Sequence, residues 1–197
     1  AIALGLDTRV LAKLSSAQTA GLETGLARKL GLSHDMGESR TRTNAMGQDL
    51  NRAWQNASPE ISPEVFFVQQ QMEKYGVDLF LDAHGDEEIP HVFTAGCEGN
   101  PGYTPRIAKL EERFRSHLKH QTKDFQTAHG YTRDEPGQAN MTLACNAVGQ
   151  KYDCLSLTLE MPFKDHNDHP NPITGWSGKR SMQLGKDVLS TIEAMVD

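Results

Sequence analysis

A histidine followed at once by a glycine and three acidic residues ends the most apolar short stretch of the chain. Residues 77–90 read VDLFLDAHGDEEIP. The apolar run Val77–Leu81 is too short for a helix and is typical of a strand buried on both faces. We therefore expect His84 at the rim of an open α/β sheet, where such sheets bind their ligands. A solvated surface loop is the alternative for this stretch taken alone.

Two further stretches carry residues that could act at the same edge. Glu160 follows the alternating apolar segment Leu155–Leu159. A carboxylate at the end of an apolar strand is costly unless it is paired, hydrogen-bonded or facing a cleft. Asn51 and Arg52 are adjacent, and the planar fork of an arginine binds a carboxylate through two parallel hydrogen bonds. The alternatives do not require a functional site: Glu160 could face solvent, and Arg52 could form a surface ion pair.

Length and composition describe an ordinary globular chain. Its 197 residues suffice for one domain with a sizeable core, and 37% are hydrophobic and 23% charged. A net charge of -6 without a basic cluster argues against a nucleic-acid partner. No run approaches transmembrane length and the N-terminus lacks the form of a signal peptide, so we expect no membrane partner. Three sparse cysteines fit a reducing compartment, and a cytoplasmic location is the default expectation.

Apolar residues recur with helical spacing in three main segments, and three shorter runs have the pattern of strands. This alternation predicts an α/β fold with a mixed, mainly parallel central sheet flanked by helices in a single domain. The polar, glycine-bearing stretch Thr127–Gln150 reads as a long surface loop. The expected helices cover Glu64–Tyr75, Arg106–Phe125 and Gly178–Val196, and the expected strands cover Val77–Leu81, His91–Ala95 and Leu155–Leu159.

Three stretches of this chain, in this order, resemble the zinc metallocarboxypeptidases, most closely the cytosolic carboxypeptidase branch with its bacterial members. They read RTNAMGQDLNRAW (42–54), DLFLDAHGDEEIP (78–90) and LTLEMPFKD (157–165). One such motif would be weak, but three in order are specific. The resemblance implies a carboxypeptidase-like catalytic domain over residues 34–197, whole or in part. Residues 1–33 would then be an N-terminal helical segment, a remnant of an upstream region.

The resemblance also implies a role for each matching residue. His84 is similar to the last ligand of a single zinc ion, and Glu160 to the general base that takes a proton from zinc-bound water. Asn51 and Arg52 resemble the pair that grips the C-terminal carboxylate of a peptide or protein substrate. Arg42 resembles the arginine that polarises the scissile carbonyl and stabilises the oxyanion. Zinc-activated water and positive charge at the oxyanion suit hydrolysis of the C-terminal peptide bond.

The chain departs from the family pattern in two places. The His-Pro-Gly-Glu word that supplies the first two zinc ligands is absent, and the nearest stretch is His34–Glu38. With His34 and Glu38 as ligands beside a third histidine and water, the site would still be sound for zinc. This stretch runs almost directly into the next motif, so either the chain is partial or segments have been deleted. Neither Tyr131 nor Tyr152 aligns with the mobile tyrosine of the digestive family members.

Two other functions remain open. The aspartoacylase and succinylglutamate desuccinylase type of amidohydrolase shares an Asp-Leu-Asn-Arg word and a zinc-binding histidine, and would cleave an N-acyl amino acid. The Glu-Met-Pro-Phe word at Glu160 favours the carboxypeptidase. The second alternative is an inactive, metal-free binding protein on the same scaffold.

Overall fold

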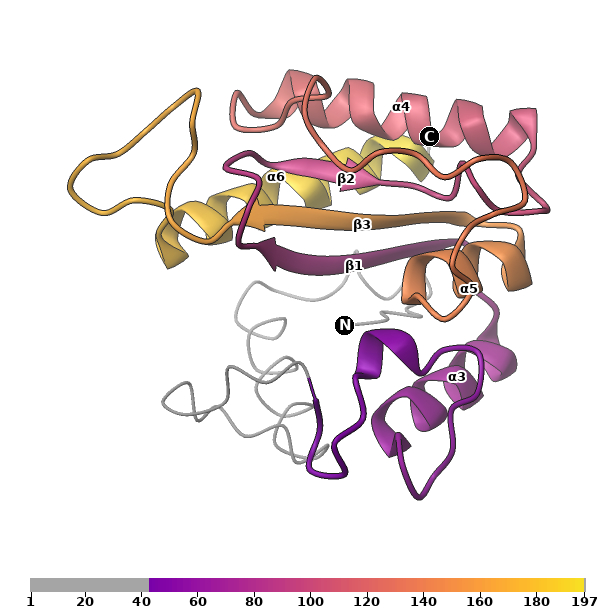
Figure 1. The fold of residues 1–197 in the computed structure, drawn as a ribbon. Coiled ribbons are helices and arrows are strands. Elements are labelled where there is room, and N and C mark those ends of the chain that lie inside the picture. Colours follow the sequence, from indigo (N-terminus) through magenta and orange to yellow (C-terminus); the bar gives the residue numbers. More distant parts are fainter. Residues whose placement is uncertain (1–42, 197) are drawn as a thin grey trace. The chain divides into compact units, whose positions relative to one another are not determined.

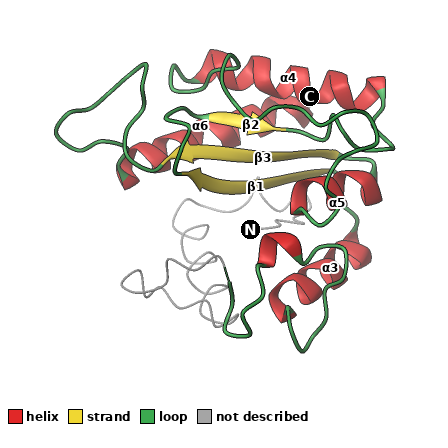
Figure 2. Ribbon diagram, in the orientation of Figure 1, coloured by secondary structure: helices red, strands yellow, loops and turns green. Residues whose placement is uncertain are grey.

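The chain forms two compact units, which meet in sequence between Gly76 and Val77. The computed structural model describes residues 43–196. In the first unit, the described residues form the 3-10 helix η1 (Leu50–Arg52) and the helix α3 (Pro63–Tyr75). The second unit contains, in chain order, β1 (Leu79–Asp86), β2 (Phe93–Ala95), α4 (Pro105–Gln121), α5 (Ala144–Tyr152), β3 (Leu155–Pro162) and α6 (Gly178–Val196) (Figures 1 and 2).

The second unit is built on a three-stranded mixed sheet with β3 in the centre. β1 pairs with β3 in parallel, and β2 pairs with β3 in the antiparallel sense. Helices lie next to this sheet (Figure 2). The predicted α/β fold with a mixed sheet is therefore confirmed. None of the described helices is long and apolar enough to cross a bilayer.

The central strand β3 is covered on both faces. Its residues Leu155, Leu157 and Leu159 are buried in one core with side chains of α4 and α6, which lie side by side in Figure 1. Burial of each such leucine side chain contributes about 1.5–3 kcal/mol to the free energy of folding. On the opposite face, the Ser156 hydroxyl donates to the carbonyl of Cys145 on α5 at 2.7 Å. Side chains alternate along a strand, so even-numbered positions of β3 share the α5 side.

Local signals explain where the helices begin and end. Pro63 occupies the first turn of α3, and Gly76, with φ +77°, ends it by donating to the Met72 carbonyl at 2.8 Å. The Thr104 hydroxyl accepts from the Ile107 N–H at the start of α4, at 3.3 Å. The predicted range of α6 agrees with the structure.

Several boundaries differ from the sequence prediction. α4 ends at Gln121, because Phe125 leaves the helix to enter the core and form a bridge with Val92. The predicted loop Thr127–Gln150 was wrong in its last part, where α5 begins at Ala144. β1 and β3 both continue past their apolar runs and include His84 and Glu160 as paired strand residues.

A fully buried carboxylate ties α4 to the segment after β2. Glu111 accepts from the Cys97 N–H at 2.9 Å and from the Tyr103 hydroxyl at 3.0 Å. The Arg115 guanidinium lies 3.3 Å from the same carboxylate. The carboxylate packs so closely on Gly96 that a β-carbon there would overlap it. Burial, followed by the nearby Glu98 charge, raises the pKa of Glu111.

This network predicts a pH-dependent difference between the wild type and Glu111→Gln. Because the folded state raises the pKa of Glu111, it binds that proton more tightly than the unfolded chain does. The wild type should therefore lose stability relative to Glu111→Gln as the pH rises from about 4.5, the ordinary value, through the folded-state pKa. Urea unfolding between pH 4 and pH 8 measures this difference. Glu112→Gln, at an exposed neighbouring position, is the control, and a pH-independent difference for Glu111→Gln would contradict the prediction.

Candidate active site

The parallel pairing of β1 and β3 places His84 directly beside Glu160. The two residues are partners in the strand register, and the Nδ1 atom of His84 lies 3.9 Å from Oε1 of Glu160. Both lie near the carboxyl ends of their strands, where open α/β sheets bind ligands. The sequence expectation that these two residues lie close together is therefore met in the geometry.

The other ring nitrogen of His84 is held by Asp82. Asp82 lies two residues earlier on the same face of β1, and its Oδ2 is 2.8 Å from Nε2 of His84. The Asp82 side chain is 1% exposed. The contact with Asp82 raises the pKa of His84, against the opposing effect of burial. Nδ1 therefore faces Glu160, which is the ring orientation that a carboxylate partner gives to a metal-binding histidine.

Glu160 is a buried carboxylate with one oxygen left over. Burial raises the pKa of its carboxyl group to about 6. Its Oε2 atom is buried and has no hydrogen-bond partner among the described residues. A buried polar atom without a partner is costly, so this oxygen indicates a missing cation or donor.

Tyr131 adds a hydroxyl to the same place. It comes from the long segment between α4 and α5, and its hydroxyl lies 2.5 Å from Oδ2 of Asp86 and 3.0 Å from Oε1 of Glu160. Burial, followed by the bond to Asp86, raises the pKa of Tyr131 and keeps the phenol protonated. One hydroxyl hydrogen cannot be donated to both carboxylates at once, so acceptors outnumber donors here.

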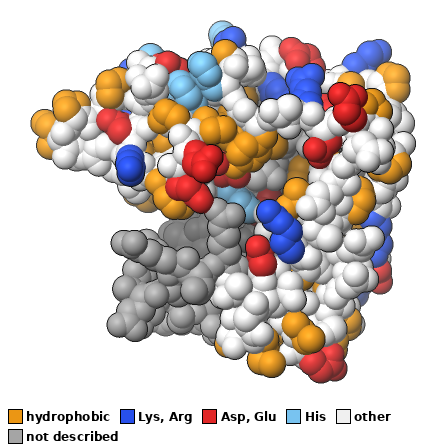
Figure 3. All heavy atoms as spheres, viewed as in Figure 1, with side chains coloured by type: hydrophobic (Ala, Val, Ile, Leu, Met, Phe, Trp, Pro, Cys, Tyr) orange, Lys and Arg blue, Asp and Glu red, His pale blue; other side chains and the backbone are white. Residues whose placement is uncertain are grey.

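These donors and acceptors fit a metal ion. An imidazole nitrogen with its tautomer fixed, beside a carboxylate with an unsatisfied oxygen, is chemistry that suits zinc. Of the three predicted ligands, His84 lies in the described part of the chain. Figure 3 shows acidic, histidine and hydrophobic side chains next to one another on the face that it views.

Several solved structures that are similar to this chain in sequence and fold are metallo-carboxypeptidases. A metallo-carboxypeptidase from Pseudomonas aeruginosa, solved in complex with (2-guanidinoethylmercapto)succinic acid, is 66% identical with a TM-score of 0.80, over 83% of this chain and 43% of that one. A putative carboxypeptidase A from Shewanella denitrificans is 51% identical with a TM-score of 0.78, over 79% and 42%. This chain is a relative of the metallo-carboxypeptidases.

Sequence comparison found two further relatives, one of which is a carboxypeptidase. Mouse cytosolic carboxypeptidase 3 is 30% identical over 77 residues, which are 37% of this chain and 8% of that protein, and this match supports the cytosolic branch. An uncharacterized protein of Zymomonas mobilis is 52% identical over 156 residues, 79% of this chain and 41% of its own length. No protein-family model matches the chain. The chain thus spans about two fifths of the length of the more similar relatives.

Asn51 and Arg52 of this metallo-carboxypeptidase relative lie in η1, in the first unit. The Asp49 carboxylate accepts from the Asn51 N–H at 2.9 Å and so caps the turn. The Arg52 side chain is exposed, and its Nη1 lies 3.4 Å from the Asn51 carbonyl. Within residues 43–76 no carboxylate pairs with Arg52, so the surface ion pair considered from the sequence does not form there. The other predicted residues, His34, Glu38 and Arg42, lie outside the described part of the chain.

Sequence reasoning missed the position of Tyr131. Its distance along the chain from Glu160 matched no family pattern, and a polar loop has no periodicity that could place it. The available signal was its aromatic ring, which packs edge-on against Phe93 with 4.9 Å between centroids. Phe93 is the β2 residue that pairs with Glu160 in the strand register, so this packing delivers the hydroxyl to the site.

We expect Tyr131→Phe to loosen the segment that carries it. The ring contact with Phe93 would remain, but two carboxylates would lose their shared donor, at a cost of about 1 kcal/mol. Hydrogen exchange should become faster in residues 126–134, and the melting temperature should fall by a few degrees. Tyr75→Phe, with an exposed ring, is the matched control. Equal effects of the two substitutions would contradict a specific role for the Tyr131 hydroxyl.

Proposed function

We propose that this chain carries the catalytic centre of a zinc-dependent carboxypeptidase that hydrolyses the C-terminal peptide bond of a peptide or protein. The observation that carries the proposal is the adjacent pair of His84 and Glu160, with Nδ1 of His84 facing a buried carboxylate that has an unsatisfied oxygen. The relationship to metallo-carboxypeptidases supports this reaction over other uses of the same groups.

In this proposal His84 binds the metal through Nδ1, and His34 and Glu38 are the further ligands that the sequence predicts. A zinc ion bound there would act as a Lewis acid and would lower the pKa of the water bound to it toward neutrality. Asp82 holds the His84 ring in the required tautomer through its 2.8 Å contact with Nε2. Asp82 is thus a positioning residue, because it acts through His84.

Glu160 is the proposed general base. Its carboxylate takes a proton from the attacking water and passes it to the leaving amine. The Tyr131 hydroxyl, 3.0 Å from Oε1, orients this carboxylate. The same hydroxyl is the proposed group that covers the substrate, in place of the tyrosine that the sequence did not align.

Arginine side chains bind and polarise the substrate in this proposal. The exposed Arg52 guanidinium, with Asn51 beside it, grips the C-terminal carboxylate of the substrate. Arg42 polarises the scissile carbonyl and stabilises the oxyanion. The related Pseudomonas aeruginosa enzyme was solved with a ligand that contains a succinic acid group, and carboxylate recognition by arginine accords with such a ligand.

Peptides with different C-terminal residues, assayed with zinc and with a chelator, test the proposal. Glu160→Gln keeps the shape of the side chain but removes the base, so kcat should fall by about 10²- to 10⁴-fold. Arg52→Ala should mainly raise KM, and C-terminal amidation of the substrate should have a similar effect. Glu193→Gln, at an exposed position on α6, is the control.

Three outcomes would contradict the carboxypeptidase proposal. Wild-type rates in Glu160→Gln would remove the proposed base. Hydrolysis of N-acyl amino acids, with intact peptides left uncut, would favour the amidohydrolase alternative. Zinc-independent binding of peptides without turnover would favour the binding protein.

A further inference from the structure

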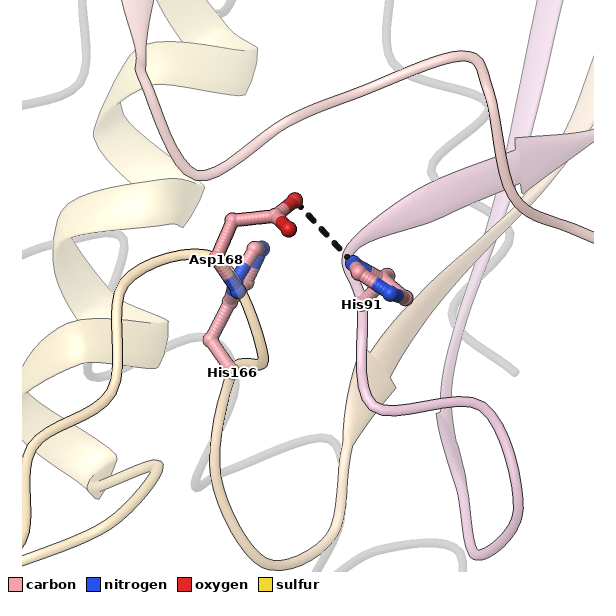
Figure 4. Close-up of side chains that lie close together, drawn as sticks. All are labelled: His91, His166 and Asp168. Atoms are coloured by element: carbon pink, nitrogen blue, oxygen red, sulfur yellow. Dashed lines mark hydrogen bonds and ion pairs between the residues drawn. The ribbon is translucent and has the colours of Figure 1, made fainter.

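A second group of metal-type side chains lies beyond the sheet edge that carries His84 and Glu160. His91 stands just before β2, and His166 and Asp168 stand in the loop between β3 and α6. One potential ligand atom from each of the three lies within 4.8 Å of the others. Figure 4 shows the Asp168 carboxylate facing the His91 ring, with the His166 ring next to it. Both histidines are buried, and Asp168 is exposed.

The Nδ1 atom of His91 lies 3.2 Å from Oδ2 of Asp168. The geometry of this contact does not make a hydrogen bond, and Nδ1 has no hydrogen-bond partner among the described residues. His91 is only 4% exposed, so water does not readily supply the missing partner. A buried imidazole nitrogen facing a carboxylate, without a hydrogen bond to it, indicates a cation that belongs between them.

His166 is prepared to bind a cation through one defined nitrogen. Its Nε2 lies 2.7 Å from the Asp124 carbonyl oxygen, which can only accept, so Nε2 carries the ring proton and Nδ1 keeps a lone pair. Metal-binding histidines have this arrangement, in which one N–H is fixed by a carbonyl. At present Nδ1 accepts the Asp168 N–H at 3.1 Å, a bond that an ion would replace.

We propose that His91, His166 and Asp168 form a second divalent-metal site, separate from the His84 centre and selective for zinc-like ions. Two imidazole nitrogens and one carboxylate oxygen are a ligand set that zinc binds well, with solvent in the remaining position on the exposed side of Asp168. Among neighbouring cations, Arg180 is already paired with Asp124 at 2.7 Å, so its charge is largely neutralised.

The proposed ion would have a structural role. Its ligands come from the start of β2 and from the loop after β3. A shared ion would therefore fix the loop against the strand that flanks Glu160. Binding to the folded state alone would raise the melting temperature in proportion to the logarithm of free zinc.

Zinc binding by the full chain in a His84→Ala background tests this proposal, because that change removes the proposed catalytic ligand. After equilibrium dialysis at fixed free zinc, His84→Ala should retain one zinc per chain and gain melting temperature. Adding Asp168→Asn, at an exposed position, or His91→Gln should remove the bound zinc and the thermal shift. His169→Gln, a neighbouring histidine outside the group, should leave both unchanged. Cobalt(II) should give a visible absorption band in His84→Ala that is lost with Asp168→Asn.

The proposal would be overturned if His84→Ala bound no zinc and showed no thermal shift. It would also be overturned if binding persisted in both His91→Gln and Asp168→Asn, since the ion would then be held elsewhere. Circular dichroism without zinc confirms that each variant is folded. Because the readouts are metal content and melting temperature, the two proposals can fail separately. A wild-type chain without peptidase activity, whose His84→Ala variant still binds zinc, would contradict the carboxypeptidase proposal alone.

Discussion

The parallel pairing of β1 with β3 is the constraint on which the candidate site depends. It sets His84 against Glu160, and a shift of one residue would turn one of them to the opposite face of the sheet. The register is held by the leucines of β3, which are buried against α4 and α6. The apolar face of the sheet thus determines where its polar residues meet. Substitutions of these core residues should therefore change the relative positions of the site residues, although they replace none of them.

The polar face of the sheet carries a free-energy cost, because it buries charged side chains. Asp82 and Glu160 are both buried on the same sheet, and the pKa of Glu160 is raised to about 6 mainly by that burial. His84 and Tyr131 offset part of this cost through hydrogen bonds and proximity. An unsatisfied carboxylate oxygen remains. A buried charge that is kept at such a cost indicates that the charge has a function. A bound cation would lower the cost of burying these carboxylates.

The sequence was sufficient for the main elements of the fold, because their apolar periodicity is local. The range of α6 and the start of β3 were predicted correctly. α5 was missed because its short apolar face is interrupted by polar residues and Gly149. The strand ends were placed too early because the polar residues Asp82 and Glu160 follow the apolar runs, and a buried polar residue has the same sequence pattern as the start of a loop.

The site could be predicted only as far as single motifs reach. His84 and Glu160 lie in recognisable sequence motifs. Tyr131, by contrast, is brought to the site by the packing of its ring on Phe93, and no pattern within a single segment encodes that contact. His91 and His166 are likewise 75 positions apart in the sequence, 166 − 91, and neither stands in a metal-binding word. Tertiary contacts of this kind need the folded chain.

The two histidine sites differ in the acceptor that holds each ring. The second nitrogen of His84 is held by the Asp82 carboxylate, whose charge raises the pKa of the ring. That of His166 is held by a neutral carbonyl, and burial lowers its pKa. A carboxylate makes an imidazole a stronger electron donor to a metal, whereas a carbonyl mainly fixes its orientation. The first arrangement suits an ion that takes part in chemistry, and the second suits one that holds a loop in place.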